Sequence, residues 1–560
     1  MREKQWMAGM MVFTLAGGTL LAGCSSSKSG AGTEPGTDGA QKEPKKDITV
    51  SIYDRGNVSP NEGTIENNRW TKWVNENGPA NVKFVAIPRT KPEEKINVLY
   101  ASGSAPDLLF EYSPNVKDPL QQQKQFMPID QLIDKTSTEY KKVLQEYPAL
   151  KKAGMKSDGK LYYFGRINWV EPNRGVLIRT DWLKKLGLSM PKTTDDLYEV
   201  IKAFTEQDPD GNGKKDTYGI SLSGNSSFSL KQIFGATSKW VVKNNELVLD
   251  WDRQKAYYTI VKRLYDEGLV DKDFATDTNG AKSKQDFITG KTGIYGILTT
   301  DIVNDTLLGT IDPLKKNVPE AEVAFLPYPK SPFGSFVPTL KNPVQMTAAV
   351  SATAKNPDAV MKYIDFMLKE PTTKALEYGI EGTHYKITDG CAEIIDAKKS
   401  KTEVSDLTVD MRMLENNGNS FNACKVPLVA YKSDPRKDEY QKAYESFRDT
   451  YLTFDRSYPE LTHSEHMPSS PKDLNTIEAN SDKANGDIWL KAIVSGDKYS
   501  IDQALKDTQD TWSKSGGKQV EEWYKKWYES DRSNSILAND IFDIAKKQNA
   551  EYKQIVQSLK

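Results

Sequence analysis

Cysteine is scarce in this chain, with three residues among 560. A chain of this length buries enough apolar surface to fold without a disulfide framework, so a small stapled scaffold is excluded. An excess of charge of one sign is also lacking, because 76 Lys and Arg face 77 Asp and Glu. The resulting net charge of −1 argues against nucleic acid as a partner. Beyond the amino-terminal segment, no apolar run is long enough to cross a bilayer.

The amino terminus has the composition of an export signal. Two basic residues precede an apolar run over 7–20, which has the length of a signal-peptide core. The next residues, Leu-Ala-Gly-Cys at 21–24, resemble the lipobox of bacterial lipoproteins. This resemblance implies removal of residues 1–23 and a lipid on Cys24. The alternative, a buried cysteine at the end of a transmembrane anchor, needs a longer apolar span.

Residues 24–46 are rich in Ser, Gly, Thr, Pro and Lys and have no apolar periodicity. Such a composition is typical of a flexible tether, and 22 residues of random coil reach about 25 Å. We therefore expect a body held outside the bacterial cell membrane by its lipid anchor, close enough to meet a membrane partner.

From residue 47 onward, apolar β-branched segments alternate with segments of helical periodicity. Strands are predicted at 47–53, 82–87 and 107–110, with helices around 69–74 and 91–101 between them. This β-α-β-α-β order predicts an α/β fold with a mainly parallel sheet covered on both faces. A stretch at about 176–344 repeats the mixture, so two lobes are expected.

Three further helical signals occur in the carboxy-terminal half. Asn356-Pro357 is typical of an N-cap followed by Pro at the first helical position. The segment 480–528 combines helical periodicity with several Trp residues, and 531–560 is amphipathic. We expect this last helix to pack on its own body rather than on a partner.

Several short motifs occur in an order that resembles the extracellular solute-binding proteins of family 1, which serve ABC importers. The resemblance is to the long lipoprotein branch associated with oligosaccharide uptake and to its alginate-binding relatives. Besides the lipobox, the motifs are Ser-Gly-Ser-Ala-Pro-Asp-Leu at 102–108, Gly-Lys-Leu-Tyr at 159–162, Arg-Thr-Asp-Trp-Leu-Lys-Lys-Leu-Gly-Leu at 179–188 and Ile-Glu-Gly-Thr-His-Tyr at 380–385.

The resemblance implies a two-lobed periplasmic-binding-protein-like fold of type II, with discontinuous α/β lobes and a central ligand cleft. The expected N-lobe combines 47–167 with 345–400, and the expected C-lobe combines 168–344 with 401–530. Residues 531–560 form the carboxy-terminal amphipathic helix.

Sugar recognition needs flat aromatic faces for ring C–H groups and polar side chains for hydroxyls. In open α/β sheets such side chains gather at the carboxyl ends of strands. The predicted ligand contacts are Tyr53, Asp54, Arg55, Glu111, Arg166, Asn168, Trp169, Trp240 and Asp301. The alternative for each of them is an ordinary core aromatic or a surface ion pair.

Residues 208–216 match the first part of a calcium loop. Oxygen side chains stand at relative positions 1, 3, 5 and 9, a Gly stands at position 6, and a backbone carbonyl is available at position 7. The predicted ligands are Asp208, Asp210, Asn212, Lys214 (through its carbonyl) and Asp216. The Glu expected at position 12 is Gly219, so this is no complete EF-hand. The alginate-binding relatives carry a similar loop with calcium, which implies a structural ion; the alternative is an Asx-turn loop without metal.

Two pairs of residues, one of cysteines and one of histidines, could form a disulfide or a metal site. Cys391 and Cys424 are 33 residues apart, and either one disulfide or two free thiols is compatible with an extracellular protein. The spacing of His463 and His466 lacks further ligands, so an exposed loop is expected rather than zinc.

These observations lead to one expected function and two alternatives. We expect a monomeric, membrane-anchored receptor that closes its lobes around an oligosaccharide and presents it to an ABC permease without chemical change. The first alternative is a secreted carbohydrate-active enzyme, a glycoside hydrolase or lyase, although no G-x-S-x-G, H-E-x-x-H or complete Walker A motif is present. The second is a purely adhesive lipoprotein.

Overall fold

The computed structural model describes residues 44–414 and 423–559. The expected signal peptide (1–23), Cys24 and all but the last residues of the expected tether lie outside the described residues. Within the described part of the chain, no helix is both long enough and apolar enough to span a bilayer.

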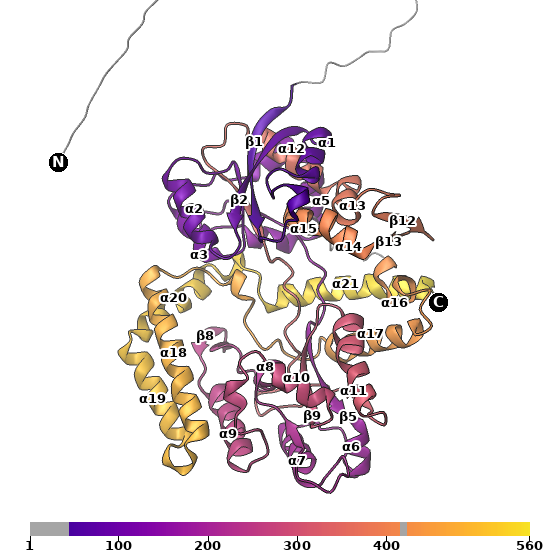
Figure 1. Ribbon diagram of the computed structural model, residues 1–560. Coiled ribbons are helices and arrows are strands. Elements are labelled where there is room, and N and C mark those ends of the chain that lie inside the picture. The colour runs from indigo at the N-terminus through magenta and orange to yellow at the C-terminus, as the bar shows by residue number, and fades with distance from the viewer. Residues whose placement is uncertain (1–43, 415–422, 560) are drawn as a thin grey trace, which may run out of the picture. The chain divides into compact units, whose positions relative to one another are not determined.

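A five-stranded sheet forms in the amino-terminal part of the chain (Figure 1). Its order is β2-β1-β3-β11-β4, with β1 (Lys46–Asp54), β2 (Ala80–Pro88), β3 (Leu108–Glu111), β4 (Tyr163–Gly165) and β11 (Thr347–Val350). The strands β1, β2 and β3 run parallel, whereas β11 is antiparallel to both β3 and β4. The β-α-β-α-β order predicted from the sequence is confirmed.

A four-stranded sheet follows, with the order β10-β5-β9-β6. Its strands are β5 (Arg174–Arg179), β6 (Tyr218–Ile220), β9 (Thr292–Leu298) and β10 (Val323–Phe325). Only the β6–β9 pair among these is parallel. In the first sheet β4 runs in the same direction as β1, β2 and β3, and of its five strands β11 alone runs against them, so the prediction of a mainly parallel sheet is confirmed there. The second sheet is mainly antiparallel.

Helices surround both sheets. Those near the first sheet are α1 (Arg69–Asn77), α2 (Pro92–Ala101), α3 (Pro114–Gln122), α4 (Asp130–Thr136), α5 (Glu139–Glu146), α12 (Pro357–Leu368), α13 (Glu370–Tyr378), α14 (Ala397–Ser400) and α15 (Asp406–Thr408). Those near the second are α6 (Thr180–Lys185), α7 (Thr194–Glu206), α8 (Gly224–Ile233), α9 (Asp252–Asp266), α10 (Ala281–Ile288), the π-helix η4 (Ile302–Ile311) and α11 (Asp312–Asn317). The remaining helices are α16 (Pro427–Ala430), α17 (Lys437–Tyr451), α18 (Lys472–Val494), α19 (Ile501–Lys514), α20 (Gly517–Ser530) and α21 (Ala538–Leu559).

Local sequence signals explain where several helices begin. At α7, the Thr193 side chain accepts from the Asp196 N–H while Asp196 accepts from the Thr193 N–H, which is a capping box. Pro stands in the first turn of α2, α3 and α12. The predicted helix after Asn356 is confirmed, but the Asn356 side chain does not cap it; its amide donates instead to the carbonyl of Asp47 over 3.0 Å.

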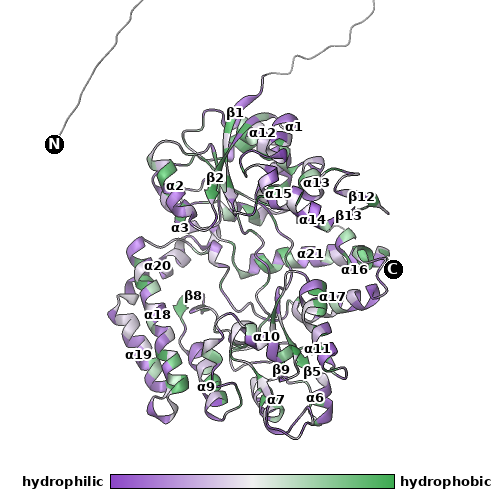
Figure 2. Ribbon diagram, viewed as in Figure 1, coloured by the Kyte–Doolittle hydropathy of each residue, from purple (hydrophilic) through white to green (hydrophobic). Residues whose placement is uncertain are grey.

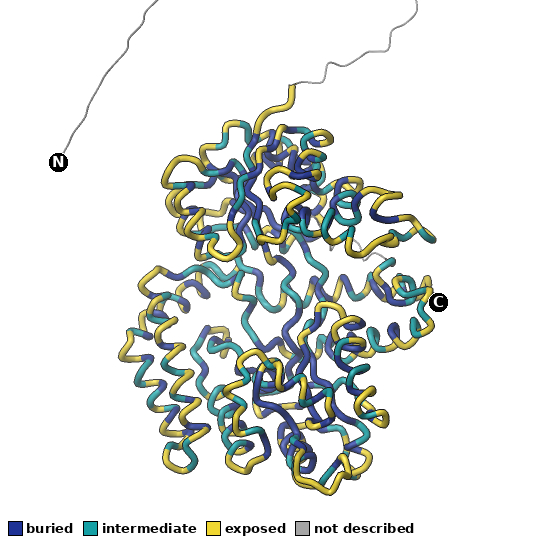
Figure 3. Tube along the Cα trace, viewed as in Figure 1, coloured by how far each residue is buried: buried dark blue, intermediate teal, exposed yellow. Residues whose placement is uncertain are grey.

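Each sheet has its own apolar core, and these two cores define two lobes. The core of the first sheet draws on residues between 48 and 170, between 337 and 411, and between 452 and 545. The core of the second draws mainly on residues between 176 and 328. Figures 2 and 3 show hydrophobic and buried residues concentrated along the central strands. Both lobes are thus discontinuous, while the lobe boundaries expected from the sequence stay predictions.

Extended segments connect the two lobes. Residues 166–173 lead from β4 to β5, and 326–346 lead from β10 to β11. The two segments are hydrogen-bonded to each other, since Lys341 N–H donates to the Glu171 carbonyl and Asn168 N–H to the Pro343 carbonyl, each over 2.8 Å. We call them the crossing segments.

The carboxy-terminal helices pack on the rest of the chain. Helices α18, α19 and α20 pack against one another, and α18 and α19 also contact α9 (Figure 1). Along α21, Ile541 and Ile544 belong to the core of the first lobe, while Tyr552 and Val556 pack beside Trp169. The expectation that this helix packs on its own body is confirmed.

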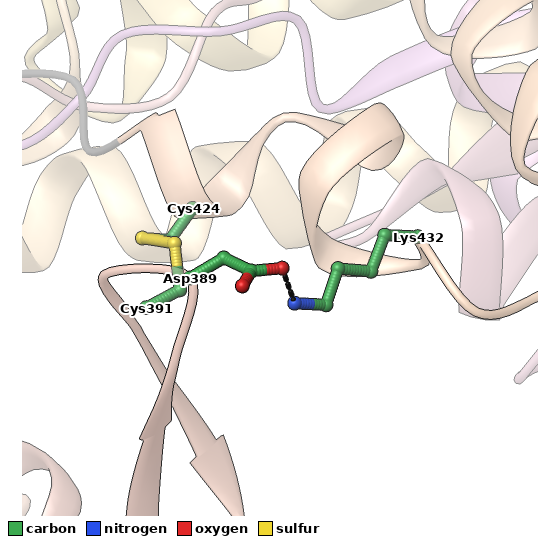
Figure 4. Close-up of a disulfide and its surroundings, with 4 residues drawn as sticks. All are labelled: Asp389, Cys391, Cys424 and Lys432. Carbon is green, nitrogen blue, oxygen red and sulfur yellow. Dashed lines mark hydrogen bonds and ion pairs between the residues drawn. A yellow bond between two sulfur atoms is a disulfide. The ribbon is translucent and has the colours of Figure 1, made fainter.

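Cys391 and Cys424 form a disulfide, with their Cα atoms 5.6 Å apart (Figure 4). Cys391 begins β13 (Cys391–Ile394), which pairs with β12 (Tyr385–Thr388) as a hairpin. Close to the disulfide, Lys432 pairs with Asp389 at the hairpin turn. Of the two readings left open by the sequence, the disulfide is the one that forms.

Candidate functional site

The carboxyl ends of β1 and β3 bring Tyr53 and Glu111 together. The Tyr53 hydroxyl donates to Glu111 Oε2 over 2.6 Å, and the Ser113 N–H donates to Oε1 over 2.7 Å. Both side chains are buried, with 2 % and 1 % of the residue exposed. Burial and the adjacent Glu111 carboxylate raise the pKa of Tyr53 far above its usual value, so the hydroxyl keeps its proton. These two residues lie together at the strand ends and are hydrogen-bonded to each other. Their contact with a ligand stays a prediction.

Arg55 follows β1 and forms a bidentate ion pair with Asp410. Its Nε lies 2.7 Å from Oδ2, and its Nη2 lies 2.9 Å from Oδ1. Asp410 is buried, whereas the Arg55 side chain is 35 % exposed. Asp54 accepts from the Gly56 N–H over 2.9 Å and so stabilises the turn after β1. Asp410 was not predicted, because nothing in the local sequence signals a partner 355 residues away.

Arg166 and Asn168 lie in the first crossing segment. The guanidinium of Arg166 donates to the Arg412 carbonyl over 2.9 Å. The amide of Asn168 donates to the Asn342 carbonyl over 3.0 Å, which ties the two crossing segments together. Both side chains thus stand where the chain passes between lobes, and their role toward a ligand stays a prediction.

One cavity brings together two of the predicted contacts, Trp169 and Asp301. It has a volume of about 430 Å³, within the usual range of small-molecule pockets. We call it the first cavity. Besides these two residues, its wall includes Glu171, Lys341, Tyr431, Tyr444 and Arg448.

Glu171 organises the wall of the first cavity. Its Oε1 accepts from the Trp169 indole N–H over 3.1 Å, from Arg448 Nη1 over 2.6 Å and from the Tyr444 hydroxyl. Its Oε2 accepts from Lys341 Nζ over 3.5 Å. Burial alone would raise the pKa of Glu171, but the charges of Arg448 and Lys341 outweigh it and hold that pKa below its usual value. The ionised carboxylate of Glu171 therefore holds the Trp169 indole ring at the cavity wall. Glu171 was not predicted from the sequence, although its position two residues after Trp169 could have indicated it.

Asp301 is the N-cap residue of η4 and stands three residues after the end of β9. Its Oδ1 accepts from the N–H groups of Val303 and Asn304 over 2.9 and 3.1 Å, which caps the helix. Its Oδ2 accepts from the Asn304 amide over 2.7 Å, and the same amide donates to the Tyr431 hydroxyl over 3.1 Å. Asp301 is nevertheless exposed at the cavity, so its oxygens retain capacity to accept from a ligand hydroxyl.

Trp240 lies elsewhere. This residue begins β7 (Trp240–Lys243), which pairs with β8 (Glu246–Leu249), and its ring centre is 4.9 Å from that of Tyr524. It lines a different cavity of about 310 Å³ with Phe336 and Tyr528. Among three cavities of the described residues, Trp169 and Asp301 share the wall of one and Trp240 lines another, while Tyr53 and Glu111 meet at the strand ends.

The loop at 208–216 folds as a tight turn. Asp208 accepts from the N–H groups of Asn212 and Gly213 over 3.1 and 3.0 Å, and the Asn212 amide donates to Asp210 and Asp216 over 2.8 and 3.1 Å. Burial and the neighbouring Asp208 raise the pKa of Asp210. Two of the predicted calcium ligands, Asp210 and Asp216, thus accept from the side-chain amide of a third, Asn212. In the described ranges, however, no three His, Cys, Asp or Glu side chains gather as a preformed metal site.

His463 and His466 do not form the exposed loop expected from the sequence. His466 is buried and its Nε2 lies 2.7 Å from the Asn342 side-chain oxygen. Burial, with the nearby charges of His463 and Lys117, lowers the pKa of His466 to about 3. The expectation is wrong because the neutral imidazole finds a partner on the second crossing segment, which the sequence does not reveal.

The sequence matches the family model described as bacterial extracellular solute-binding protein over residues 64–374. The chain belongs to this family. Among its relatives, the lipoprotein LipO of Bacillus subtilis is 25 % identical and covers 95 % of this chain and 99 % of its own length. The polygalacturonan/rhamnogalacturonan-binding protein YtcQ of the same species is also 25 % identical, over 93 % of this chain and 98 % of its own. The fructooligosaccharide ABC transporter substrate-binding protein FusA of Streptococcus pneumoniae is 35 % identical over 34 % of this chain and 39 % of its own.

Solved structures share the fold. An extracellular solute-binding protein from Bifidobacterium longum subsp. infantis superposes with a TM-score of 0.63 at 20 % identity, over 87 % of this chain and 98 % of its own. The alginate-binding protein AlgQ2 gives 0.58 at 21 % identity, over 88 % and 100 %. The two-lobed periplasmic-binding-protein-like fold is confirmed. Because the relatives are substrate-binding proteins, this family member is a binding protein and not an enzyme.

Proposed function

We propose that this solute-binding protein takes up an oligosaccharide in its first cavity and delivers it to an ABC permease. The observation that carries the proposal is the cavity wall itself, which combines the Trp169 indole, held by Glu171, with the exposed carboxylate of Asp301. An aromatic face with fixed charged partners suits a sugar ring and its hydroxyls. The names of YtcQ and FusA, both carbohydrate-binding, support the same ligand class.

Binding and delivery require no bond to be made or broken. A saccharide that touches both lobes would favour a closed form, by as much as its contacts are stronger in that form. The permease would then recognise the closed form. A small-angle scattering comparison with and without the saccharide tests this step, and an unchanged radius of gyration would contradict it.

Calorimetric titration with fructooligosaccharides, oligogalacturonides and neutral plant oligosaccharides tests the ligand class. We expect one of these series to bind, and we expect Trp169→Ala to weaken that binding at least tenfold. Trp73→Ala is the matched control, because Trp73 stacks on Phe366 within the first lobe and lines none of the three cavities described here. The absence of binding to every saccharide, or cleavage products in the reaction mixture, would reject the proposal.

We further propose that Cys24 carries the lipid that anchors the protein outside the cell membrane. The support is the lipobox at 21–24, followed by a polar tether, and the description of LipO as a lipoprotein. Cys24→Ser should move the protein from the membrane fraction into the medium and abolish labelling by a palmitate analogue. Unchanged membrane association would contradict the anchor.

We also propose that the loop at 208–216 binds a structural calcium ion. The ion would replace the hydrogen bonds that Asn212 donates to Asp210 and Asp216, and would relieve the crowding of their carboxylates. Calcium should then raise the melting temperature of the wild type but not of an Asp208→Asn, Asp210→Asn double variant. Asp438→Asn, at the exposed start of α17, is the control. An equal response of all three proteins would exclude the loop.

A further inference from the structure

A second cavity, of about 260 Å³, lies between helices α3 and α20, the crossing residues 344–347 and the loop 465–469. Among the described residues it shares no lining side chain with the first cavity. Four aromatic rings belong to its wall: Tyr112, Tyr163, Trp523 and Trp527. We call it the second cavity.

Helix α20 presents two of these rings together. Trp523 and Trp527 are four residues apart and therefore lie on one face of the helix. Within residues 44–414 and 423–559, neither indole N–H has a hydrogen-bond partner. Trp527 is buried in a core with Tyr524 and Tyr528, whereas Trp523 is half-buried, so Trp523 is the ring of the two whose face and N–H are available at this wall.

Lys117 projects from α3 into this wall and is buried, with 4 % of the residue exposed. Its ammonium donates to the Glu111 carbonyl over 2.9 Å and to the Thr347 hydroxyl, and it lies 5.1 Å from the centre of the Tyr163 ring. It forms no ion pair with any side chain in the described part of the chain. An ammonium has three N–H donors, so one remains for a further acceptor. Burial lowers the pKa of Lys117 to about 8, which still leaves it mostly protonated at neutral pH.

The charges around the second cavity cancel. The wall has as many ammonium groups (Lys117, Lys152 and Lys156) as carboxylates (Asp118, Glu465 and Asp531). Lys156 pairs with Asp118 and Lys152 with Asp540, each over 2.7 Å. The buried His466 adds no charge, because its pKa is about 3. An ionic ligand would bring a net charge into this balanced wall, whereas a neutral ligand rich in hydroxyls would not. The side-chain amides of Gln121, Gln122 and Gln345 complete the wall with paired donors and acceptors.

We propose that the second cavity is a second binding site for a short neutral saccharide, with a sugar ring on the Trp523 face and a hydroxyl accepting from Lys117. This inference rests on the proposed function, since it assigns the same ligand class to a site apart from the first cavity. The second crossing segment contributes Lys341 to the first cavity and Val344 to the second. Three residues of extended chain span about 11 Å at most, so the two sites are neighbours along this segment.

The test uses the full mature chain, titrated by calorimetry with kestose, maltotriose, cellotriose and galactotriose. We expect the wild type to bind two molecules of one of these trisaccharides. Lys117→Met and Trp523→Phe should each weaken one of the two sites at least tenfold. Met preserves the length of the buried side chain, and Phe preserves an aromatic face while removing the indole N–H, so both variants should retain the fold; their melting curves check this.

Lys231→Met is the matched control. Lys231 is also largely desolvated, and burial lowers its pKa as it does that of Lys117, but it lines none of the three cavities. This variant should bind two molecules as the wild type does. Trp169→Ala should weaken only the other site.

Three results would overturn the inference. If the wild type binds one trisaccharide that Trp169→Ala abolishes and Lys117→Met leaves unchanged, the second site does not exist while the proposed function stands. If Lys117→Met and Trp523→Phe both still bind two molecules with wild-type affinity, the second molecule lies elsewhere. If no saccharide binds to the wild type, the proposed function fails and the second site fails with it.

Discussion

Arg448 donates from Nη1 to Glu171 Oε1 over 2.6 Å and thereby ties α17 to the first crossing segment. Only 3 % of the Arg448 side chain and 15 % of the Glu171 side chain are exposed, so the pair is largely desolvated. The same Oε1 holds the Trp169 indole. The wall of the first cavity therefore depends on a buried ion pair that also joins two parts of the fold.

Replacing the acidic member of this pair should be costly. Glu171→Gln leaves the guanidinium of Arg448 buried without a counter-charge, which we expect to lower the free energy of unfolding by about 3–5 kcal/mol. It should also weaken saccharide binding, because Trp169 and Tyr444 lose their common acceptor. Denaturant unfolding and calorimetry measure the two effects. Glu439→Gln, which removes one of the two carboxylates paired with the more exposed Arg436 and leaves Asp312 in place, should cost about 1 kcal/mol or less. Equal losses in the two variants would contradict this account.

A second prediction concerns the buried pair at the carboxyl ends of β1 and β3. Tyr53→Phe removes the hydroxyl that donates to Glu111 and leaves a buried carboxylate oxygen short of a donor. We expect a loss of about 1–3 kcal/mol in the free energy of unfolding. Tyr499→Phe is the control, because the Tyr499 hydroxyl donates to Asp507 at a more exposed site. A Tyr53→Phe variant as stable as this control would show that Glu111 is satisfied in another way.

A third prediction is a pH dependence that His466 imposes on stability. Its pKa is about 3 in the folded protein, against an ordinary value of 6.5. Between these values the unfolded chain binds a proton that the folded chain does not, so stability falls as the pH falls below about 6.5. The slope from one such group is about 1.4 kcal/mol per pH unit.

His466→Gln should remove this part of the slope, since Gln does not titrate and its amide retains a donor for Asn342. Unfolding curves at several pH values between 4.5 and 7.5 measure the difference. His463, whose pKa burial lowers to about 4, leaves some slope in both proteins. Parallel stability curves for variant and wild type would rule out His466 as the titrating group.

The sequence predicted the elements whose signals are local. Strands such as 47–53 and helices such as 91–101 follow from apolar periodicity and from breakers close by in the chain. The direction of β11 could not be predicted, because it depends on where the crossing segment inserts that strand between β3 and β4. The insertion of a strand from a distant part of the chain does not alter the hydrophobic periodicity from which strands and helices are predicted.

In the candidate site, too, the residues with local signals could be predicted, and the long-range contacts between them could not. Residue type and position after β9 were enough to nominate Asp301, and Trp169 stands out as an aromatic residue in an irregular segment. Their common cavity depends on Arg448 and Tyr444 from α17, more than 270 residues after Glu171. Likewise, Trp523 lines a cavity because residues of α3 and of the loop 465–469 form other parts of its wall, which the sequence of α20 alone does not reveal.

The disulfide provides the last prediction. It closes a loop of 33 residues between the β12–β13 hairpin and Cys424, and Cys424 itself lines the first cavity (Figure 4). A Cys391→Ser, Cys424→Ser variant should lose about 3–4 kcal/mol of stability by the chain-entropy relation. It should also bind saccharide more weakly, because the cavity wall at Cys424 is then held to the hairpin only by neighbouring contacts such as the exposed Lys432–Asp389 pair. Dithiothreitol should reproduce both losses in the wild type and change nothing in the double variant. If reduction lowers the melting temperature but leaves affinity unchanged, the disulfide stabilises the fold without shaping the site.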